Sequence, residues 1–439
     1  MTSNSSACDA AAVEPLNNST TAKQYAELPF LPEGGVASAK GFQAVGIHAG
    51  FRPDPNRLDF ALVVADEPVA CAGVFTQNVF CAAPVTVSRE HLDGVGYGTV
   101  RAVSINSGIA NAATGEVGLT TAHESARIVA ETVGCTEDEV LVASTGVIGQ
   151  HLQMEPFKTG VPQAFEQVSR SGGASAARAI MTTDTHPKER AVSFAGDGIG
   201  YDGCTFTVGG MCKGSGMIMP NMATMIAVLT TDAPVAANDL HTALTAAVNL
   251  SFNKVTVDSD TSTNDTCILM ASGAAAGGKA AMQPGTPAFD AFEKALRTVC
   301  VSLAREMATD GEGATRMVTV NVVGAKTAAD ADAAARTVAN SPLVKTAIYG
   351  HDANWGRIAG ALGRSGAAFA QENVAIDIMG LPVCRDGLTV PFDEDEALRR
   401  FESPEVVIDI DLGSGDENTT IWTCDFSHEY VSINGDYRS

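Results

Sequence analysis

Apolar residues return every three or four positions in three parts of this chain, at residues 117–133, 240–248 and 289–303. That spacing places the apolar side chains on one face of an α-helix and the polar side chains on the other face. We therefore predict three amphipathic helices, each packing one face against a hydrophobic core.

Shorter apolar runs, bounded by glycine, proline and small polar residues, predict β-strands. The predicted strands cover residues 42–51, 58–66, 70–88, 139–144, 224–229, 255–257, 317–323, 406–412 and 419–426. The turn sequence "GSGDEN" separates the last two strands, so we expect them to form a hairpin. The segment "GDGIGYDG" at 196–203 lacks the helix that follows a dinucleotide-binding loop, and we interpret it as a turn between strands.

The mixture of helices and strands predicts an α/β fold with layered sheets and helices packed outside them. The sequence has no internal repeat and no long linker. The acidic run "FDEDEA" at 392–397 is typical of a helix start or a solvated loop. Residues 1–28 are rich in Ser, Thr, Asn and Ala, and we predict a disordered N-terminal tail there.

The excess of acidic over basic residues excludes some classes of binding partner. The chain has 51 acidic and 28 basic residues, for a formal net charge of −23. This argues against nucleic acid, whose binding depends on neutralising phosphates, and against anionic membrane surfaces. The sequence also lacks an apolar run of about 18 residues and a secretory signal. We therefore expect a cytoplasmic protein that acts on small molecules.

Cysteine and histidine show no metal-binding pattern. The ten cysteines are scattered without a C-x-x-C pair, and the eight histidines are dispersed. We predict reduced thiols and no metal site. Among the histidines, only His351, which precedes "DANWGR", stands in an unusual local sequence.

The stretch "KGSGMIMPNMATMIAVLTTDA", residues 213–233, carries the main candidate chemistry. Thr224 follows small and flexible residues and begins an apolar run, and a structural role is the ordinary reading of such a threonine. If Thr224 became an N-terminus, however, it would carry a nucleophile and a base on one residue, because an α-amino group has a pKa near ~7.7–8.0. The turn "STGVIG" at 144–149 is a candidate oxyanion hole.

Several segments, in order, carry a resemblance to a known family. They are "FTQNVFCAAPV" (75–85), "ASTGVIG" (143–149), "IMTTDT" (180–185), "KGSGMIMPNMATMIAVLTTDA" (213–233), "TSTNDT" (261–266), "DGEGATR" (310–316), "NWGRI" (354–358) and "YVSINGDYRS" (430–439). Over residues 30–439 the chain resembles the ornithine acetyltransferases, the bifunctional glutamate N-acetyltransferases of arginine biosynthesis. It departs from the family at Ile109, where Asn is usual, and at Ser259, where Gly is usual.

The resemblance implies an αββα-like sandwich of the N-terminal-nucleophile type with a smaller second lobe. It also implies self-cleavage between Ala223 and Thr224, by attack of the Thr224 hydroxyl on the Ala223 carbonyl. The products would be an α chain (29–223, after the tail) and a β chain (224–439) that together form one catalytic unit. Two copies of each would assemble into a heterotetramer.

The implied reaction moves an acetyl group from N2-acetyl-L-ornithine to L-glutamate through an acetyl ester on Thr224. Thr145 and Gly146 match the family's oxyanion hole. The substrate-binding positions match Thr182, Lys213, Thr224, Glu312, Asn434 and Ser439. Lys213 would supply local positive charge for a substrate carboxylate, whereas Glu312 could pair with the ornithine side chain or with the Thr224 amine. Asp310 and Arg316 are interpreted as supporting residues.

No cofactor is expected, and acetyl-CoA as a second acetyl donor stays open. Two alternatives also stay open. One is an aminopeptidase of related fold, which would use the same self-cleavage but pass the acyl group to water. The other is an amino-acid-binding protein without enzymatic activity, in which Thr224 would be an ordinary strand residue and the chain would stay intact.

Overall fold

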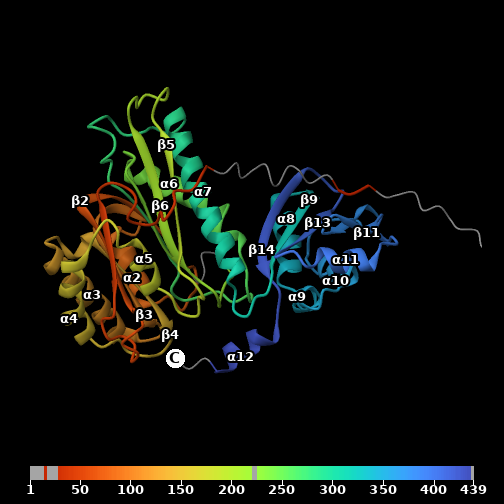
Figure 1. The fold of residues 1–439 in the computed structure, drawn as a ribbon, viewed down its shortest axis with the longest axis horizontal. Helices are drawn as coiled ribbons and strands as arrows, with labels where there is room; N and C mark the ends of the chain where they lie inside the picture. Colours follow the sequence, from red (N-terminus) through yellow and green to blue (C-terminus); the bar gives the residue numbers. More distant parts are fainter. Residues whose placement is uncertain (1–13, 17–27, 220–224, 437–439) are drawn as a thin grey trace, which may run out of the picture. The chain divides into compact units, whose positions relative to one another are not determined.

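The computed structural model describes residues 14–16, 28–219 and 225–436. The chain divides into two compact units (Figure 1). The described residues of the larger unit lie within Tyr25–Ala314 and His428–Ser439, and those of the smaller unit lie within Met1–Gln24 and Thr315–Ser427. The predicted α/β class with a smaller second lobe is confirmed.

One hydrogen-bonded sheet forms the centre of the larger unit, in the order β4-β3-β2-β8-β7-β6-β5, with β1 paired to β2. Its strands are β1 Phe42–Ile47, β2 Phe60–Phe75, β3 Tyr97–Ile109, β4 Val140–Val147, β5 Lys188–Ala195, β6 Thr205–Lys213, β7 Ile226–Thr231 and β8 Thr266–Ala271. β3 pairs in parallel with β4, and β7 pairs in parallel with β8. β6 and β7 are antiparallel neighbours on either side of the predicted cleavage point, so both products would contribute to one sheet.

Helices pack on both faces of this sheet. They are α2 Ala83–His91, α3 Gly115–Val133, α4 Glu155–Gln167, α5 Gly173–Ala179, α6 Ala237–Asn249 and α7 Pro287–Thr309. The larger unit also contains α12 His428–Asp436 and the short 3-10 helices η1 Glu137–Glu139 and η2 Phe252–Lys254. Side chains alternate along β2. Phe60 and Leu62 join the core made with α3 and α4, whereas Ala61 and Val63 join the core made with α5.

The three helices predicted from apolar spacing are confirmed as α3, α6 and α7. α7 shows how local sequence sets a helix boundary. Thr286 accepts a hydrogen bond from the backbone N–H of Phe289, and Pro287 occupies the first turn, where its missing N–H costs nothing. The turn predicted at 196–203 also connects two strands, β5 and β6.

The smaller unit contains a second sheet in the order β12-β11-β10-β13-β9-β14. Its strands are β9 Met317–Ala325, β10 Ala375–Ile378, β11 Leu381–Arg385, β12 Leu388–Thr389, β13 Glu405–Asp411 and β14 Glu417–Cys424. Its helices are α8 Ala328–Ala339, α9 Pro342–Tyr349, α10 Trp355–Gly363, α11 Glu394–Arg400 and the 3-10 helix η3 Gln371–Asn373. α11 begins inside the acidic run, after the N-cap Asp393, which confirms a helix start there.

The predicted hairpin of β13 and β14 is wrong, because β9 lies between these strands. Val320 of β9 is paired in parallel with Ile408 of β13 and antiparallel with Ile421 of β14. All three side chains enter one apolar core. The "GSGDEN" turn crosses the end of β9 instead of closing a hairpin, and the Ser414 N–H donates to the Gly324 carbonyl. A short turn sequence therefore does not reveal a strand that arrives from far away in the chain.

Two other strand predictions need correction. The run 70–88 supplies the end of β2, but its second half becomes α2, where Pro84 occupies the first helical turn. Short apolar runs do not separate a strand from a buried helix. No strand covers residues 255–257, which follow η2. The strand predicted at 224–229 is β7, of which Thr224 lies outside the described residues.

Most of the predicted N-terminal tail also lies outside the described residues, but residues 14–16 contact the smaller unit. The Leu16 N–H donates to Asp377 at 2.7 Å, and the Arg385 guanidinium donates to the Glu14 carbonyl at 2.9 Å. This short piece is therefore held in place, contrary to the expectation for the whole tail.

The nine cysteines within the described ranges form no disulfide with one another. Over the same ranges, every helix is too short or too polar to cross a bilayer.

Candidate active site

A cavity of about 130 Å³ in the larger unit collects most of the predicted site residues. Six of them line it: Thr145, Gly146, Thr182, Lys213, Glu312 and Asn434. They come from the ends of β4 and β6, from the loops after α5 and α7, and from α12. Ala223, Thr224 and Ser439 lie outside the described residues, and the functional roles of all nine stay predictions.

Thr145 and Gly146 lie within the last residues of the β4 strand, not in a turn after it as expected, because the parallel pairing with β3 continues to Val147. Gly146 has a φ of +128°, and a Cβ there would lie 2.2 Å from the carbonyl carbon of Gly108. Only glycine tolerates this conformation and this close approach. The Thr145 hydroxyl has no hydrogen-bond partner among the described residues, so it remains available to a ligand in the cavity.

Lys213, the last residue of β6, is only 3% exposed although it lines the cavity. Its ammonium makes no hydrogen bond within the described parts of the chain. Burial and the nearby Lys188 charge lower its pKa, and the carboxylates of Asp184, Glu312 and Asp265 act in the opposite direction. A buried ammonium without a hydrogen-bonding partner beside a cavity is well suited to a substrate carboxylate.

A buried network behind Lys213 fixes its surroundings. Asp184 accepts the N–H groups of Thr182 at 3.0 Å and Gly214 at 2.7 Å, so it joins the two cavity segments. The Lys188 ammonium donates to Asp184 at 2.8 Å and forms a second ion pair with Asp310. Burial opposes the charged form of Asp184, but the charges of Lys213 and Lys188 hold its pKa well below the usual value. This assigns Asp310 the supporting position expected from the sequence.

Glu312 and Asn434 meet at another side of the cavity. The Asn434 side-chain N–H donates to Glu312 Oε2 at 2.7 Å. Gly216 packs against the same carboxylate, since a Cβ there would lie 2.2 Å from Glu312 atoms. Glu312 is 7% exposed. The structure therefore places a buried acid, oriented by an amide from α12, in the cavity that contains the Lys213 cation.

Two aspartates hold the chain on either side of residues 220–224. Before this segment, Asp258 accepts the N–H groups of Met217 at 2.6 Å and Ile218 at 2.9 Å. After it, Asp265 accepts the N–H of Met225 at 2.7 Å. Ser259, next to Asp258, has a φ of +70°, a backbone conformation that favours glycine and fits the departure expected there from the resemblance.

Asp265 has an unusual environment. It is 1% exposed, and its second oxygen, Oδ2, has no hydrogen-bond partner among the described residues. Burial raises its pKa well above the usual value, although the Met225 N–H, the Lys213 charge and the nearby Thr76 hydroxyl act against this. An unsatisfied buried carboxyl next to the predicted nucleophile marks a functional position.

The sequence analysis did not single out Asp184, Lys188, Asn264 or Asp265. Asn264 also lines the cavity and donates to the carbonyls of Ala110 at 2.6 Å and Ser144 at 2.8 Å. Both Asn264 and Asp265 belong to the motif "TSTNDT", whose residues have no functional role predicted from the sequence. The run of polar residues directly before the apolar strand β8 was the sequence feature that could have indicated these site residues.

Three residues considered from the sequence do not line this cavity. His351 and Arg316 belong to the smaller unit, where His351 stacks on the Phe401 ring and Arg316 donates to the Phe401 carbonyl. Ile109 is partly buried against the core made with α3 and α4. This departure from the family pattern therefore affects packing behind β4 and does not line the cavity.

The comparison with known proteins covers almost the whole chain. A model of the ArgJ family matches residues 43–439. The arginine biosynthesis bifunctional protein ArgJ of Geobacillus kaustophilus is 43% identical over 96% of this chain and 100% of its own length. The protein of the same name from Symbiobacterium thermophilum is 47% identical over 92% of this chain and 99% of its own.

Among solved structures, the ArgJ protein of Bacillus halodurans is 41% identical, with a TM-score of 0.46 over 47% of this chain and 97% of that chain. An ornithine acetyltransferase of Mycobacterium tuberculosis, solved with ornithine, is 39% identical, with a TM-score of 0.40 over 44% of this chain and 98% of that chain. From the family match and the extent of sequence identity, this chain belongs to the ArgJ family.

Proposed function

We propose that this protein is an acetyltransferase of arginine biosynthesis that moves the acetyl group of N2-acetyl-L-ornithine to L-glutamate. Family membership supports the proposal, as do relatives named as bifunctional proteins of arginine biosynthesis. The observation that carries it is one cavity lined by a buried cation, Lys213, a buried acid, Glu312, and the hydroxyl of Thr145. An amino acid presents the complementary carboxylate and ammonium.

Self-cleavage prepares the nucleophile. The Thr224 hydroxyl attacks the Ala223 carbonyl, the peptide nitrogen leaves as the new α-amine of Thr224, and water hydrolyses the resulting ester. Asp258 and Asp265 support this step, because they fix the backbone on both sides of the scissile segment. Fixing both sides limits the conformations of the short segment between them and favours intramolecular attack.

In the transfer reaction, the Thr224 amine accepts the proton of its own hydroxyl as the oxygen attacks the acetyl carbonyl. Ornithine leaves as its amine, and the acetyl group remains as an ester on Thr224. The amine of glutamate then attacks this ester, and Thr224 regains its proton. The Thr145 hydroxyl and the Gly146 N–H donate to the oxyanion of each tetrahedral intermediate, a role typically worth ~2.7–4 kcal/mol per donor.

The charged side chains orient the two amino acids. Lys213 binds the α-carboxylate that acetylornithine and glutamate share. Glu312, held by Asn434, binds the ornithine ammonium. We assign Asp265 as a positioning residue whose carboxylate supports the ammonium that forms when the Thr224 amine takes a proton, as the aspartate of a hydrolase triad supports its histidine. Cleavage thus creates the cation that the buried Asp265 carboxyl lacks before processing.

The proposal extends to the assembly and the donors. The α and β chains remain associated through the β6–β7 pairing, and two of each form the active particle. No bound cofactor is needed, and acetyl-CoA acts as a second acetyl donor if the protein also makes N-acetylglutamate directly.

A donor and acceptor panel tests the function. Purified protein incubated with acetylornithine and glutamate should release ornithine and N-acetylglutamate in equal amounts, and peptide mapping should find the acetyl group on the peptide that begins with Thr224. Acetyl-CoA in place of acetylornithine tests the second donor. Release of acetate without N-acetylglutamate would instead support the aminopeptidase-like hydrolase.

A further inference from the structure

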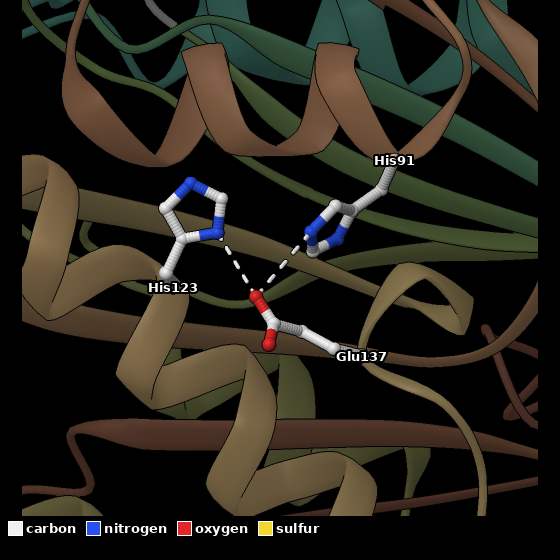
Figure 2. A group of neighbouring side chains, drawn as sticks. All are labelled: His91, His123 and Glu137. Atoms are coloured by element: carbon white, nitrogen blue, oxygen red, sulfur yellow. Dashed lines mark hydrogen bonds and ion pairs between the residues drawn. The ribbon is translucent and has the colours of Figure 1, made fainter.

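A second cluster of polar side chains lies in the larger unit, away from the cavity described above. It consists of His91 at the end of α2, His123 on α3 and Glu137 in η1 (Figure 2). One potential ligand atom from each residue lies within 4.8 Å of the other two. None of the three lines the cavity, and the proposed reaction uses none of them.

The His91 ring is oriented so that Nε2 points toward Glu137 (Figure 2). Its side chain is 8% exposed, and Nδ1 lies 2.7 Å from the Val140 carbonyl. A carbonyl only accepts, so Nδ1 carries the hydrogen and neutral His91 has its lone pair on Nε2. Nε2 faces Glu137 Oε1 at 3.9 Å, which is too far for a hydrogen bond. The buried His91 ring therefore directs Nε2, an acceptor without a hydrogen bond, toward the Glu137 carboxylate.

His123 shows the matching arrangement. Its Nδ1 lies 2.9 Å from Glu137 Oε1, and its Nε2 lies 3.4 Å from Glu90 Oε2. Histidines that bind metals usually donate their second ring N–H to a carbonyl or a carboxylate, which fixes the ring. The Val140 carbonyl offers this support to His91, and Glu90 offers it to His123.

The distances suit a small divalent cation. Nitrogen and oxygen ligands about 2.0–2.2 Å from a tetrahedral zinc ion are roughly 3.3–3.5 Å from each other. The observed separations from Glu137 Oε1, 2.9 Å to His123 and 3.9 Å to His91, lie on either side of that value. Glu137 and His123 are 37% and 43% exposed, so both can adjust by a few tenths of an ångström and a water can complete the coordination.

We propose that His91 Nε2, His123 Nδ1 and Glu137 Oε1 bind a divalent cation of the zinc type. The cation replaces the hydrogen between His123 and Glu137, and the bound, neutral His123 carries its one ring hydrogen on Nε2, toward Glu90. Binding links α2, α3 and η1, three elements that are separate in sequence, and therefore stabilises the folded larger unit.

Zinc titration of protein stripped with a chelator tests the site, with a chromophoric chelator as competitor. Wild type should bind one equivalent per chain tightly. His123→Gln should weaken this binding at least about 100-fold, and Glu90→Gln about 10-fold, because Glu90 only supports the ring of His123. His151→Gln, a change at an exposed histidine elsewhere in the same unit, should bind like wild type.

Co²⁺ provides a second measurement. Wild type and His151→Gln should show the strong visible absorption of a low-coordinate N/O site, and His123→Gln should lose it. Circular dichroism checks that each variant is folded, and zinc should raise the melting temperature of wild type but not of His123→Gln. The proposal is overturned if wild type binds no tight equivalent, or if His123→Gln binds zinc as wild type does.

Discussion

The buried lysine of the smaller unit, Lys345, and the buried lysine of the cavity, Lys213, have different surroundings. In the smaller unit, the Lys345 ammonium donates to the Thr423 hydroxyl at 2.8 Å and lies over the Phe426 ring, and Asp377 forms a 2.6 Å ion pair with Arg385. In the larger unit, Oδ2 of Asp265 has no hydrogen-bond partner among the described residues. The Lys213 ammonium, which is 3% exposed, donates no hydrogen bond to them either. Folding alone favours the first arrangement.

Buried charges that lack a hydrogen bond mark positions that serve function at a cost in stability. A buried charge without a hydrogen bond costs stability in the empty protein. Lys213 lines the cavity, and Asp265 accepts the N–H of Met225, the residue that follows the predicted nucleophile. The paired charges of the smaller unit explain packing and need no ligand. Four experiments can break or sharpen this contrast.

The largest effect should come from the nucleophile itself. Thr224→Ala removes the hydroxyl that both cleavage and transfer require, so the chain should remain whole and inactive. Intact-mass analysis should show one species for the variant and two fragments meeting at Ala223-Thr224 for wild type. A wild-type chain that stays uncut and yet transfers acetyl groups would contradict the proposed role of Thr224.

The two buried lysines provide a direct comparison. Lys213→Met should lower kcat/KM by roughly 10- to 150-fold, the value of a hydrogen bond to a charged group. It should change the free energy of unfolding less than Lys345→Met does, because methionine needs no partner. In addition, Asp184, which loses the Lys213 charge, keeps its ion pair with Lys188. Lys345→Met should do the reverse: it should cost about 1.5–3 kcal/mol of unfolding free energy and leave the kinetics unchanged.

Urea unfolding and steady-state kinetics on the two lysine variants measure both quantities. If Lys345→Met lost activity at unchanged stability, or if Lys213→Met lost stability alone, the contrast between the units would fail.

Asp265→Asn should change the pH dependence of stability. Burial raises the pKa of Asp265 in the folded protein above its ordinary value of 3.8, so the folded state holds a proton that the unfolded state releases. The protonated Asp265 therefore stabilises the folded wild type below pH 3.8. This contribution to the free energy of unfolding falls as the pH rises from 3.8 toward the pKa of Asp265 in the folded protein. The asparagine amide does not titrate, so the Asp265→Asn variant does not lose stability in this way. Its free energy of unfolding, relative to that of the uncleaved wild type, should rise over the same pH range.

The same variant should have a lower kcat, by about 10-fold, because a neutral amide supports the Thr224 ammonium less well than a carboxylate. KM should stay unchanged, since the substrate contacts remain. Urea titrations at several pH values, carried out in the Thr224→Ala background, separate the stability effect from processing. Parallel curves of stability against pH, with and without the Asp265→Asn change, would refute the buried-carboxyl interpretation.

The smallest effect is expected at α12. Asn434→Ala removes the amide that orients Glu312 and should raise KM for acetylornithine up to about 10-fold, with little change in kcat. Ser432→Ala is the matched control, because Ser432 lies on the same helix and donates only to the His428 carbonyl. Equal KM values for the two variants would show that α12 contributes packing and no substrate contact.

Much of the local structure could be predicted from the sequence. The helices α3, α6 and α7 were predictable because a 3.6-residue period of apolar side chains reflects one buried face. Family motifs also indicated Thr145, Gly146, Lys213 and Glu312 as members of one site, and the fold brings these residues to one cavity.

The tertiary structure decided the features that depend on distant pairing. β9 enters between β13 and β14 because all three bury apolar side chains in one core, which no turn sequence records. Asp184, Lys188 and Asp310 become a buried network only when β5 meets the end of α7. His91, His123 and Glu137 have no ligand spacing in the sequence, and they converge because α2 and α3 pack together beside η1. Sequence periodicity reports which face of an element is buried, whereas the charges that meet there are set by long-range packing.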